Sequence, residues 1–185
     1  MLNRIALFAD DIDQDVTHAL DVIESFGLKW VEIRSAWGKN MIDHADEQTR
    51  EVHALIAKRG MKVRCIAAPL LKCKLKGKGE VSQETFNAQT RDSIEQQLAV
   101  LRRAIELARL FDTNLVRSFS FWKVGNAPTP IWDELLDPFQ PIVRIAEQEG
   151  ITLAMENDFE CNIGTGAWSA KFIKAINSPN FRLLW

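Results

Sequence analysis

The sequence is poor in the residues that mark several common functional classes. Its three cysteines show no Cys-x-x-Cys spacing, and they are Cys65, Cys73 and Cys161. An odd number of unpaired cysteines predicts free thiols in a reducing compartment. It also disfavours a zinc site built from these residues, because structural zinc sites use closely spaced ligands.

Histidine is equally scarce, and none of the three lies where a parallel strand is predicted to end. The three residues are His18, His44 and His53. We expect each of them on the surface or on one face of a helix. The easiest candidates for a general base or a metal ligand are therefore missing.

No excess of one charge sign is present, and long hydrophobic runs are absent. The net charge is −2 with a pI of about 6.0, which gives no support for a nucleic-acid partner. No apolar stretch approaches the length of a membrane span, and the N-terminus has no signal-peptide pattern. These absences predict a cytoplasmic protein without a membrane partner.

What is present is an alternation of short apolar runs and amphipathic segments. Strands are expected over residues 5–9, 30–35, 62–69, 114–122, 151–157 and 181–185. Helices are expected over residues 16–26, 45–59, from Ser82 or Gln89 to Phe111, over 131–149 with a break near Pro138 or Pro141, and over 165–176. Gly27, Gly60 and Gly150 fall at predicted helix ends just before strands.

This order predicts an α/β fold with about six parallel strands and five helices. The turn after the first strand, Asp10-Asp11-Ile12-Asp13, contains no glycine, so a dinucleotide-binding open sheet is disfavoured. An incomplete (β/α)8 TIM barrel is favoured, because a complete one takes about 250 residues. We expect a single partial barrel domain over residues 1–185, with the last strands and helices of the barrel absent.

Period-two alternation sorts the strand faces and singles out candidate site residues. In residues 151–157 the apolar set is Ile151, Leu153 and Met155, so Glu156 points to the barrel interior at the carboxyl end of its strand. Barrel active sites are built at that end. An inward carboxylate is costly unless it is paired or bound, which favours a functional role for Glu156 over a structural ion pair.

Other charged residues leave alternatives open. Glu32 and Arg34 share one strand face, so they could neutralise each other or reach a ligand. Arg117 lies inside a strand with two mixed faces, where a substrate contact and a buried ion pair are equally compatible with the pattern. Lys72 and Lys74 follow the third strand in a basic, flexible loop, where solvated lysines are the simplest interpretation.

Several of these segments together resemble one family. The segments are Val31-Glu32-Ile33-Arg34, Ala104-Ile105-Glu106-Leu107-Ala108, Val116-Arg117-Ser118-Phe119-Ser120, Leu153-Ala154-Met155-Glu156-Asn157 and Leu183-Leu184-Trp185. In their order and spacing they resemble the xylose isomerase-like TIM-barrel superfamily, in its sugar phosphate isomerase/epimerase branch. The resemblance covers essentially the whole chain.

The resemblance implies a divalent metal (Mg, Mn or Zn) at the barrel mouth, with Glu156 as one ligand. The family's next ligand, an Asp that often follows a Trp after the sixth strand, would come after Trp185, the last residue. A His beside the fifth-strand Glu and a His at the third-strand exit are replaced by Asn157 and by Ala67-Ala68-Pro69. One carboxylate cannot hold a hard divalent ion, which takes about six ligands, so we expect weak or absent metal binding by this chain.

The implied reaction is proton transfer next to a carbonyl of a sugar or sugar phosphate, through a metal-stabilised enediolate. Glu156 would be metal ligand and catalytic residue. The substrate-binding residues would be Glu32, Arg34, Lys72, Arg117 and Asn157. The alternatives are a non-catalytic truncated barrel that serves as a binding module and, less favoured, an abasic-site endonuclease-like metalloenzyme. Uncovered first and sixth strands predict self-association through open sheet edges.

Overall fold

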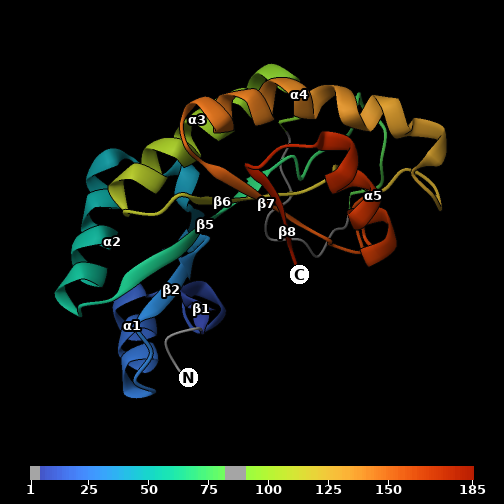
Figure 1. Cartoon of the computed structure of the whole chain (residues 1–185). Coiled ribbons are helices and arrows are strands. Elements are labelled where there is room, and N and C mark those ends of the chain that lie inside the picture. Colours follow the sequence, from blue (N-terminus) through green and yellow to red (C-terminus); the bar gives the residue numbers. More distant parts are fainter. Residues whose placement is uncertain (1–4, 82–90) are drawn as a thin grey trace. The chain divides into compact units, whose positions relative to one another are not determined.

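The structure is a computed structural model that describes residues 5–81 and 91–185. Its strands follow the order β1-β2-β5-β6-β7-β8 in one sheet, so sequence neighbours are also sheet neighbours. Helices alternate with these strands along the chain (Figure 1). The described residues thus form six parallel strands and five α-helices, and the sheet does not close, as the sequence predicts.

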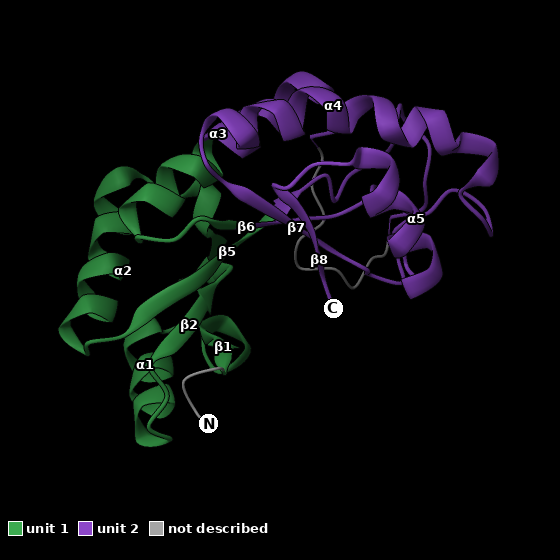
Figure 2. Ribbon diagram, in the orientation of Figure 1, with its two compact units in different colours: residues 1–68, 103–115 green, residues 69–102, 116–185 purple. Residues whose placement is uncertain are grey.

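The chain divides into two compact units, shown in different colours in Figure 2. Unit 1 comprises residues 1–68 and 103–115, and unit 2 comprises residues 69–102 and 116–185. Three elements contribute residues to both units, namely β5 (Lys62–Leu70), α3 (Ile94–Leu110) and β6 (Leu115–Ser118). The start predicted for α3, at Ser82 or Gln89, lies outside the described residues.

Unit 1 contains the first βα repeats. Its elements are β1 (Ala6–Phe8), the 3-10 turn η2 (Ala9–Asp11), α1 (Val16–Ser25), β2 (Trp30–Ile33), β3 (Ser35–Ala36), β4 (Lys39–Asn40), η3 (Met41–Asp43) and α2 (Asp46–Lys58). Strand β2 pairs in parallel with β1 and with β5. Val31 and Ile33 are buried, as alternation predicts, and Leu20 and Ile23 are buried on the apolar stripe of α1.

The short antiparallel hairpin β3–β4 is an addition that the sequence did not predict. Residue 35 was expected at the end of the second strand, but the parallel strand stops at Ile33 and Ser35 begins the hairpin. Trp37 and Gly38 take positive φ angles of 51° and 73° at its turn. Two-residue hairpin turns need positive φ, which alternation of apolar residues does not reveal.

Unit 2 contains the later repeats. Its elements are β6 (Leu115–Ser118), η4 (Thr129–Ile131), α4 (Trp132–Gln148), β7 (Thr152–Glu156), α5 (Gly166–Ile176) and β8 (Phe181–Leu184). Helix α4 packs on β7 and α5, and α5 packs on β8. The rings of Phe139, Phe172 and Phe181 form edge-to-face pairs 4.9–6.1 Å apart, each worth about 0.5–1.5 kcal/mol beyond burial.

Two expectations for unit 2 are wrong. Helix α4 is not interrupted, since Pro138 and Pro141 lie within one continuous helix. Both are half-buried and flank the fully buried Phe139, so packing of the apolar stripe holds the helix together despite two missing backbone donors. The fourth strand, expected to reach Trp122, ends at Ser118, because Phe121 has a φ of 59° that an extended strand cannot contain.

Candidate active site

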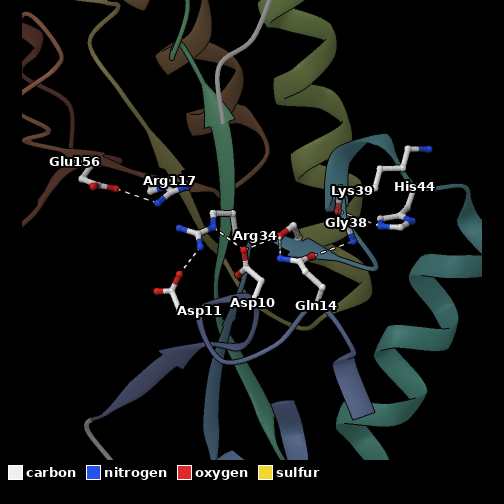
Figure 3. Close-up of polar contacts among 10 residues, drawn as sticks. Asp10, Asp11, Gln14, Arg34, Gly38, Lys39, His44, Arg117 and Glu156 are labelled. Carbon is white, nitrogen blue, oxygen red and sulfur yellow. Dashed lines mark hydrogen bonds and ion pairs between the residues drawn. The ribbon is translucent and has the colours of Figure 1, made fainter. Parts of the chain in front are cut away.

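The carboxyl ends of β6 and β7 bring together Arg117 and Glu156. Arg117 Nη1 lies 3.1 Å from Glu156 Oε2 (Figure 3). The arginine side chain is only 4% exposed, whereas the carboxylate is 34% exposed. Arg117 Cζ also lies 4.8 Å from the centre of the Phe119 ring. Of the two open alternatives for Arg117, the structure therefore shows the buried ion pair, with a partner that solvent can reach.

A second ion pair joins Lys72, two residues after β5, to Asp158, two residues after β7. Lys72 Nζ lies 2.6 Å from Asp158 Oδ2, and both side chains are more than 90% buried. The ammonium group sits 4.5 Å from the centre of the Phe119 ring and 5.3 Å from the Trp122 ring. The expectation of a solvated lysine is wrong for Lys72, because an aromatic box and a carboxylate replace water around its charge.

The loop that carries Lys72 is held by backbone bonds to the segment after β6. Phe119 N donates to Leu70 O at 2.8 Å, Phe121 N to Leu71 O at 2.9 Å, and Trp122 N to Cys73 O at 2.9 Å. Leu71 and Phe121 both adopt positive φ, at 63° and 59°. Non-glycine residues keep this conformation where surrounding bonds impose it, and these three backbone bonds hold the beginning of the loop against the segment after β6.

Asn162, after β7, fastens the same segment from the other side. Its buried side-chain amide donates to the carbonyl oxygens of residues 120, 121 and 122 at 3.0, 3.2 and 2.9 Å. Its Oδ1 accepts from Val124 N at 2.9 Å. A single side chain thus fixes the backbone beside both ion pairs, and the sequence analysis did not identify it.

Unit 1 has a charge cluster of its own where β1 and β2 end. Arg34 Nε donates to Asp10 Oδ2 at 2.7 Å, Ser35 Oγ donates to the same oxygen at 2.6 Å, and Arg34 also pairs with Asp11 (Figure 3). Burial alone would lower the pKa of Arg34, but the bonds and charges of Asp10 and Asp11 outweigh it and the pKa is raised. Arg34 is therefore a permanent cation held by the first strand's exit.

His44 is not the surface residue that was expected. It is 5% exposed, and its Nε2 lies 2.9 Å from Ala36 O and 3.2 Å from Lys39 O. A carbonyl oxygen can only accept, so Nε2 donates and the ring closes the β3–β4 hairpin (Figure 3). The backbone carbonyls of the β3–β4 hairpin are thus the hydrogen-bond partners of His44. The turn of this hairpin was not recognised in the sequence.

The three cysteines are free, as the sequence predicts, and the structure places all three in the interior. Burial, with a smaller contribution from Asp92, raises the pKa of the Cys73 thiol to about 12. Burial likewise raises the pKa of Cys161, with a further contribution from Asp158. A raised pKa keeps a thiol protonated near neutral pH, and the protonated form is a poor nucleophile.

Glu32 and Asn157 are the two remaining predicted site residues. Glu32 is half-buried within β2, and Asn157 is half-buried directly after β7. Their ligand roles stay predictions. Asp10 and Asp158 were missed as site residues, although each carried a signal: Asp10 directly follows the first strand, and Asp158 has the same strand parity as Glu156.

The described residues do not make a metal site by themselves. Within residues 5–81 and 91–185, no group of three or more His, Cys, Asp or Glu side chains could hold a metal ion. Glu156, the last residue of β7, and Asp158, two residues further on, are each bonded to a cation. A hard divalent ion prefers several oxygen ligands and is repelled by such cations, so these residues do not fit it unaided.

Comparison with known proteins identifies the family. Residues 20–185 match the family described as the xylose isomerase-like TIM barrel, and the chain belongs to that family. A search of curated proteins found no significant match.

Several solved structures share the fold. One is the probable 3-DHS dehydratase AsbF from Bacillus anthracis, with a TM-score of 0.70, 15% identity, and coverage of 96% of this chain and 61% of that one. A second is a xylose isomerase-like TIM barrel protein from Mycobacterium smegmatis in complex with magnesium, with a TM-score of 0.69 and 19% identity. The match covers 97% of this chain and 63% of that one. A third is a D-psicose 3-epimerase in the presence of D-fructose, with a TM-score of 0.64 and 13% identity. The match covers 96% of this chain and 61% of that one.

These similarities establish the fold. The chain spans 61–63% of the length of these three structures. In the part of the chain that the structure describes, no helix is both long and apolar enough to cross a membrane.

Proposed function

We propose that this chain carries the proton-transfer residues of an isomerase or epimerase that acts on sugars or sugar phosphates. The observation that supports this most is the Arg117–Glu156 pair at the carboxyl ends of β6 and β7. The carboxylate of Glu156 is accessible to solvent, whereas the guanidinium of Arg117 that holds it is buried. This arrangement has the chemistry of a positioned base beside a site that stabilises negative charge.

The reaction follows from the roles of these side chains. The Glu156 carboxylate takes a proton from the carbon next to the substrate carbonyl, and the electron pair of that C–H bond moves to the carbonyl oxygen. The enediolate that results carries negative charge on oxygen, which Arg117 stabilises. Return of the proton to the neighbouring carbon, with passage of the hydroxyl proton from one enediolate oxygen to the other, gives isomerisation. Epimerisation requires a second acid, such as water, that delivers a proton to the opposite face of the original carbon.

The family membership and the D-psicose 3-epimerase among the similar structures agree with this chemistry. The dehydratase similarity agrees as well, because elimination next to a carbonyl can begin with the same proton removal. The substrate class and the reaction type remain proposals for the whole protein, as does the assignment of Glu32, Arg34, Lys72 and Asn157 to substrate binding.

A divalent metal, when bound in proteins of this kind, supplies polarisation of the carbonyl oxygen. Because the described residues do not fit such an ion unaided, we expect the 185-residue chain to bind Mg²⁺ or Mn²⁺ only weakly. Titration calorimetry on the purified chain measures this directly. An affinity in the micromolar range would show that the chain contains a complete metal site.

The proposed function is tested by exchange of solvent deuterium into a ketose. The chain is incubated in D₂O with D-fructose or dihydroxyacetone, with and without Mg²⁺, Mn²⁺ or Zn²⁺, and exchange at the carbon next to the carbonyl is followed by NMR. We expect exchange above the buffer rate. Glu156→Gln should slow it by about 10²–10⁴-fold, the usual contribution of a general base.

The matched control is Glu95→Gln, because Glu95 is an exposed carboxylate in the first turn of α3. Its exchange rate should equal that of the unmodified chain. Exchange that Glu156→Gln leaves unaffected would contradict the assignment of the base. No exchange under any metal condition would instead favour a binding module, in which Glu156 and Asp158 serve only as structural partners of Arg117 and Lys72.

A further inference from the structure

A cavity of about 410 Å³ lies in unit 2, outside the two ion pairs described above. Its lining comes from three loops, which follow the successive strands β5, β6 and β7. The residues used below are Glu80, Lys123, Asn126, Phe159 and Glu160. Loops at the carboxyl ends of barrel strands are where ligands bind, and the volume is in the range of small-molecule sites.

Backbone bonds join the three loops, so the cavity is a built feature. Glu80 N donates to Lys123 O at 3.3 Å, and Lys123 N donates to Glu160 O at 2.9 Å. Gly79 packs against Trp122, where an added Cβ would lie 2.7 Å from the carbonyl oxygen. Only glycine allows this close approach together with a φ of 112°, and the cavity wall depends on it.

Phe159 is the distinctive residue of the lining. It is 79% exposed, and within residues 5–81 and 91–185 the other largely exposed phenylalanine is Phe26, at 68%. A phenylalanine ring left in water forgoes the burial energy that its apolar surface would provide. Beside it the lining offers carboxylate, amide and ammonium groups. A ring that packs against C–H groups, flanked by donors and acceptors for hydroxyls, matches the mixed surface of a polyol.

The position of Phe159 relative to Glu156 sets what can bind. The two residues are three positions apart, and three residues of extended chain span at most about 10 Å. A ketose whose carbonyl end meets Glu156 can therefore extend its other end over the Phe159 ring only if its chain is long enough. A three-carbon ketose has no such second end.

We propose that this cavity is a subsite for the non-reacting end of a ketose, with Phe159 as the stacking platform that selects six-carbon over three-carbon substrates. The subsite rests on the proposed function for its reacting end. Phe159 is a binding and specificity residue, and Glu156 performs the proton transfer.

The test compares two ketoses in the deuterium-exchange assay on the full 185-residue chain. Phe159→Ala should slow exchange into D-fructose at least about tenfold more than exchange into dihydroxyacetone, because lost apolar contact in a pocket typically costs that much discrimination. Phe159→Trp, which keeps a ring at this position, should restore the preference. Phe26→Ala is the matched control, an exposed phenylalanine in the other unit, and should leave the ratio unchanged.

A direct binding measurement keeps this proposal separate from the catalytic one. Saturation-transfer NMR should show transfer of saturation from the protein to D-fructose. Phe159→Ala should abolish this transfer, and Phe26→Ala should leave it unchanged. If neither ketose exchanges but this transfer behaves as expected, the catalytic proposal fails and the subsite stands. If Phe159→Ala changes neither the transfer nor the ratio between the ketoses, the subsite is wrong, whatever the exchange rate.

Discussion

At the scale of single residues, four charged side chains near the carboxyl ends of the unit 2 strands form two ion pairs. The pairs are Arg117 with Glu156 and Lys72 with Asp158. Both cations lie over the Phe119 ring. A cation buried in this way is stable only while its partner remains ionised and bonded. The same arrangement leaves Glu156 the more exposed of the two carboxylates, which is what a base needs and a structural partner does not.

The Lys72–Asp158 pair gives a prediction on stability. Asp158→Asn removes the carboxylate that is bonded to the buried ammonium of Lys72, so the free energy of unfolding should fall by about 3–5 kcal/mol. Urea denaturation followed by circular dichroism measures it. Asp137→Asn, at an exposed position of α4, should change stability by less than about 0.5 kcal/mol.

The double variant Asp158→Asn with Lys72→Met provides the internal check. Because methionine leaves no unpaired charge, the double variant should be more stable than Asp158→Asn alone. Equal stability of the two would mean that Lys72 is hydrated in solution and that the pair is not buried.

At the scale of elements, the helices and strands that the sequence predicts are those whose apolar periodicity is uninterrupted. Residues 151–156 alternate cleanly, and Leu153 and Met155 are fully buried in β7. The segments between elements are different, because backbone φ angles and side-chain-to-backbone bonds define them. Asn162 and the residues around Phe121 carry no periodic signal, although they position the ends of β6 and β7.

Asn162 gives the prediction at this scale. Asn162→Ala leaves three carbonyl groups and one N–H group without the partner that the side chain provides, so we expect a loss of about 3 kcal/mol in the free energy of unfolding. Because Trp122 lies in the segment that it fastens, tryptophan fluorescence should report a loosened environment under native conditions.

Asn114→Ala is the matched control, because Asn114 is exposed just before β6. It should leave both the fluorescence and the midpoint of denaturation unchanged. If Asn162→Ala were equally silent, the loops would be held by their own backbone bonds and Asn162 would be dispensable.

At the scale of the whole molecule, the sheet ends at β1 on one side and β8 on the other. Unpaired backbone donors and acceptors on an edge strand are a template for pairing with another chain. Leu7, in the middle of β1, is 36% exposed and adds apolar surface to that edge. The order of strands therefore predicts association between copies of this chain.

Light scattering on the purified chain should show species larger than 21.0 kDa that grow with concentration. Leu7→Lys, which places a charge on the edge, should reduce the association. Phe26→Lys is the control, since it removes a larger exposed apolar side chain away from the edge strands. A monodisperse monomer at all concentrations would contradict this prediction.

The sequence by itself determined the fold class, the six strands and Glu156 as the foremost candidate, because apolar periodicity and strand parity are local properties. Only the tertiary structure decided which charges meet. Arg34 takes Asp10 from 24 positions away, and Lys72 takes Asp158 from 86 positions away. Such pairs depend on the side-by-side packing of strands that are distant in the chain, and no local pattern encodes them.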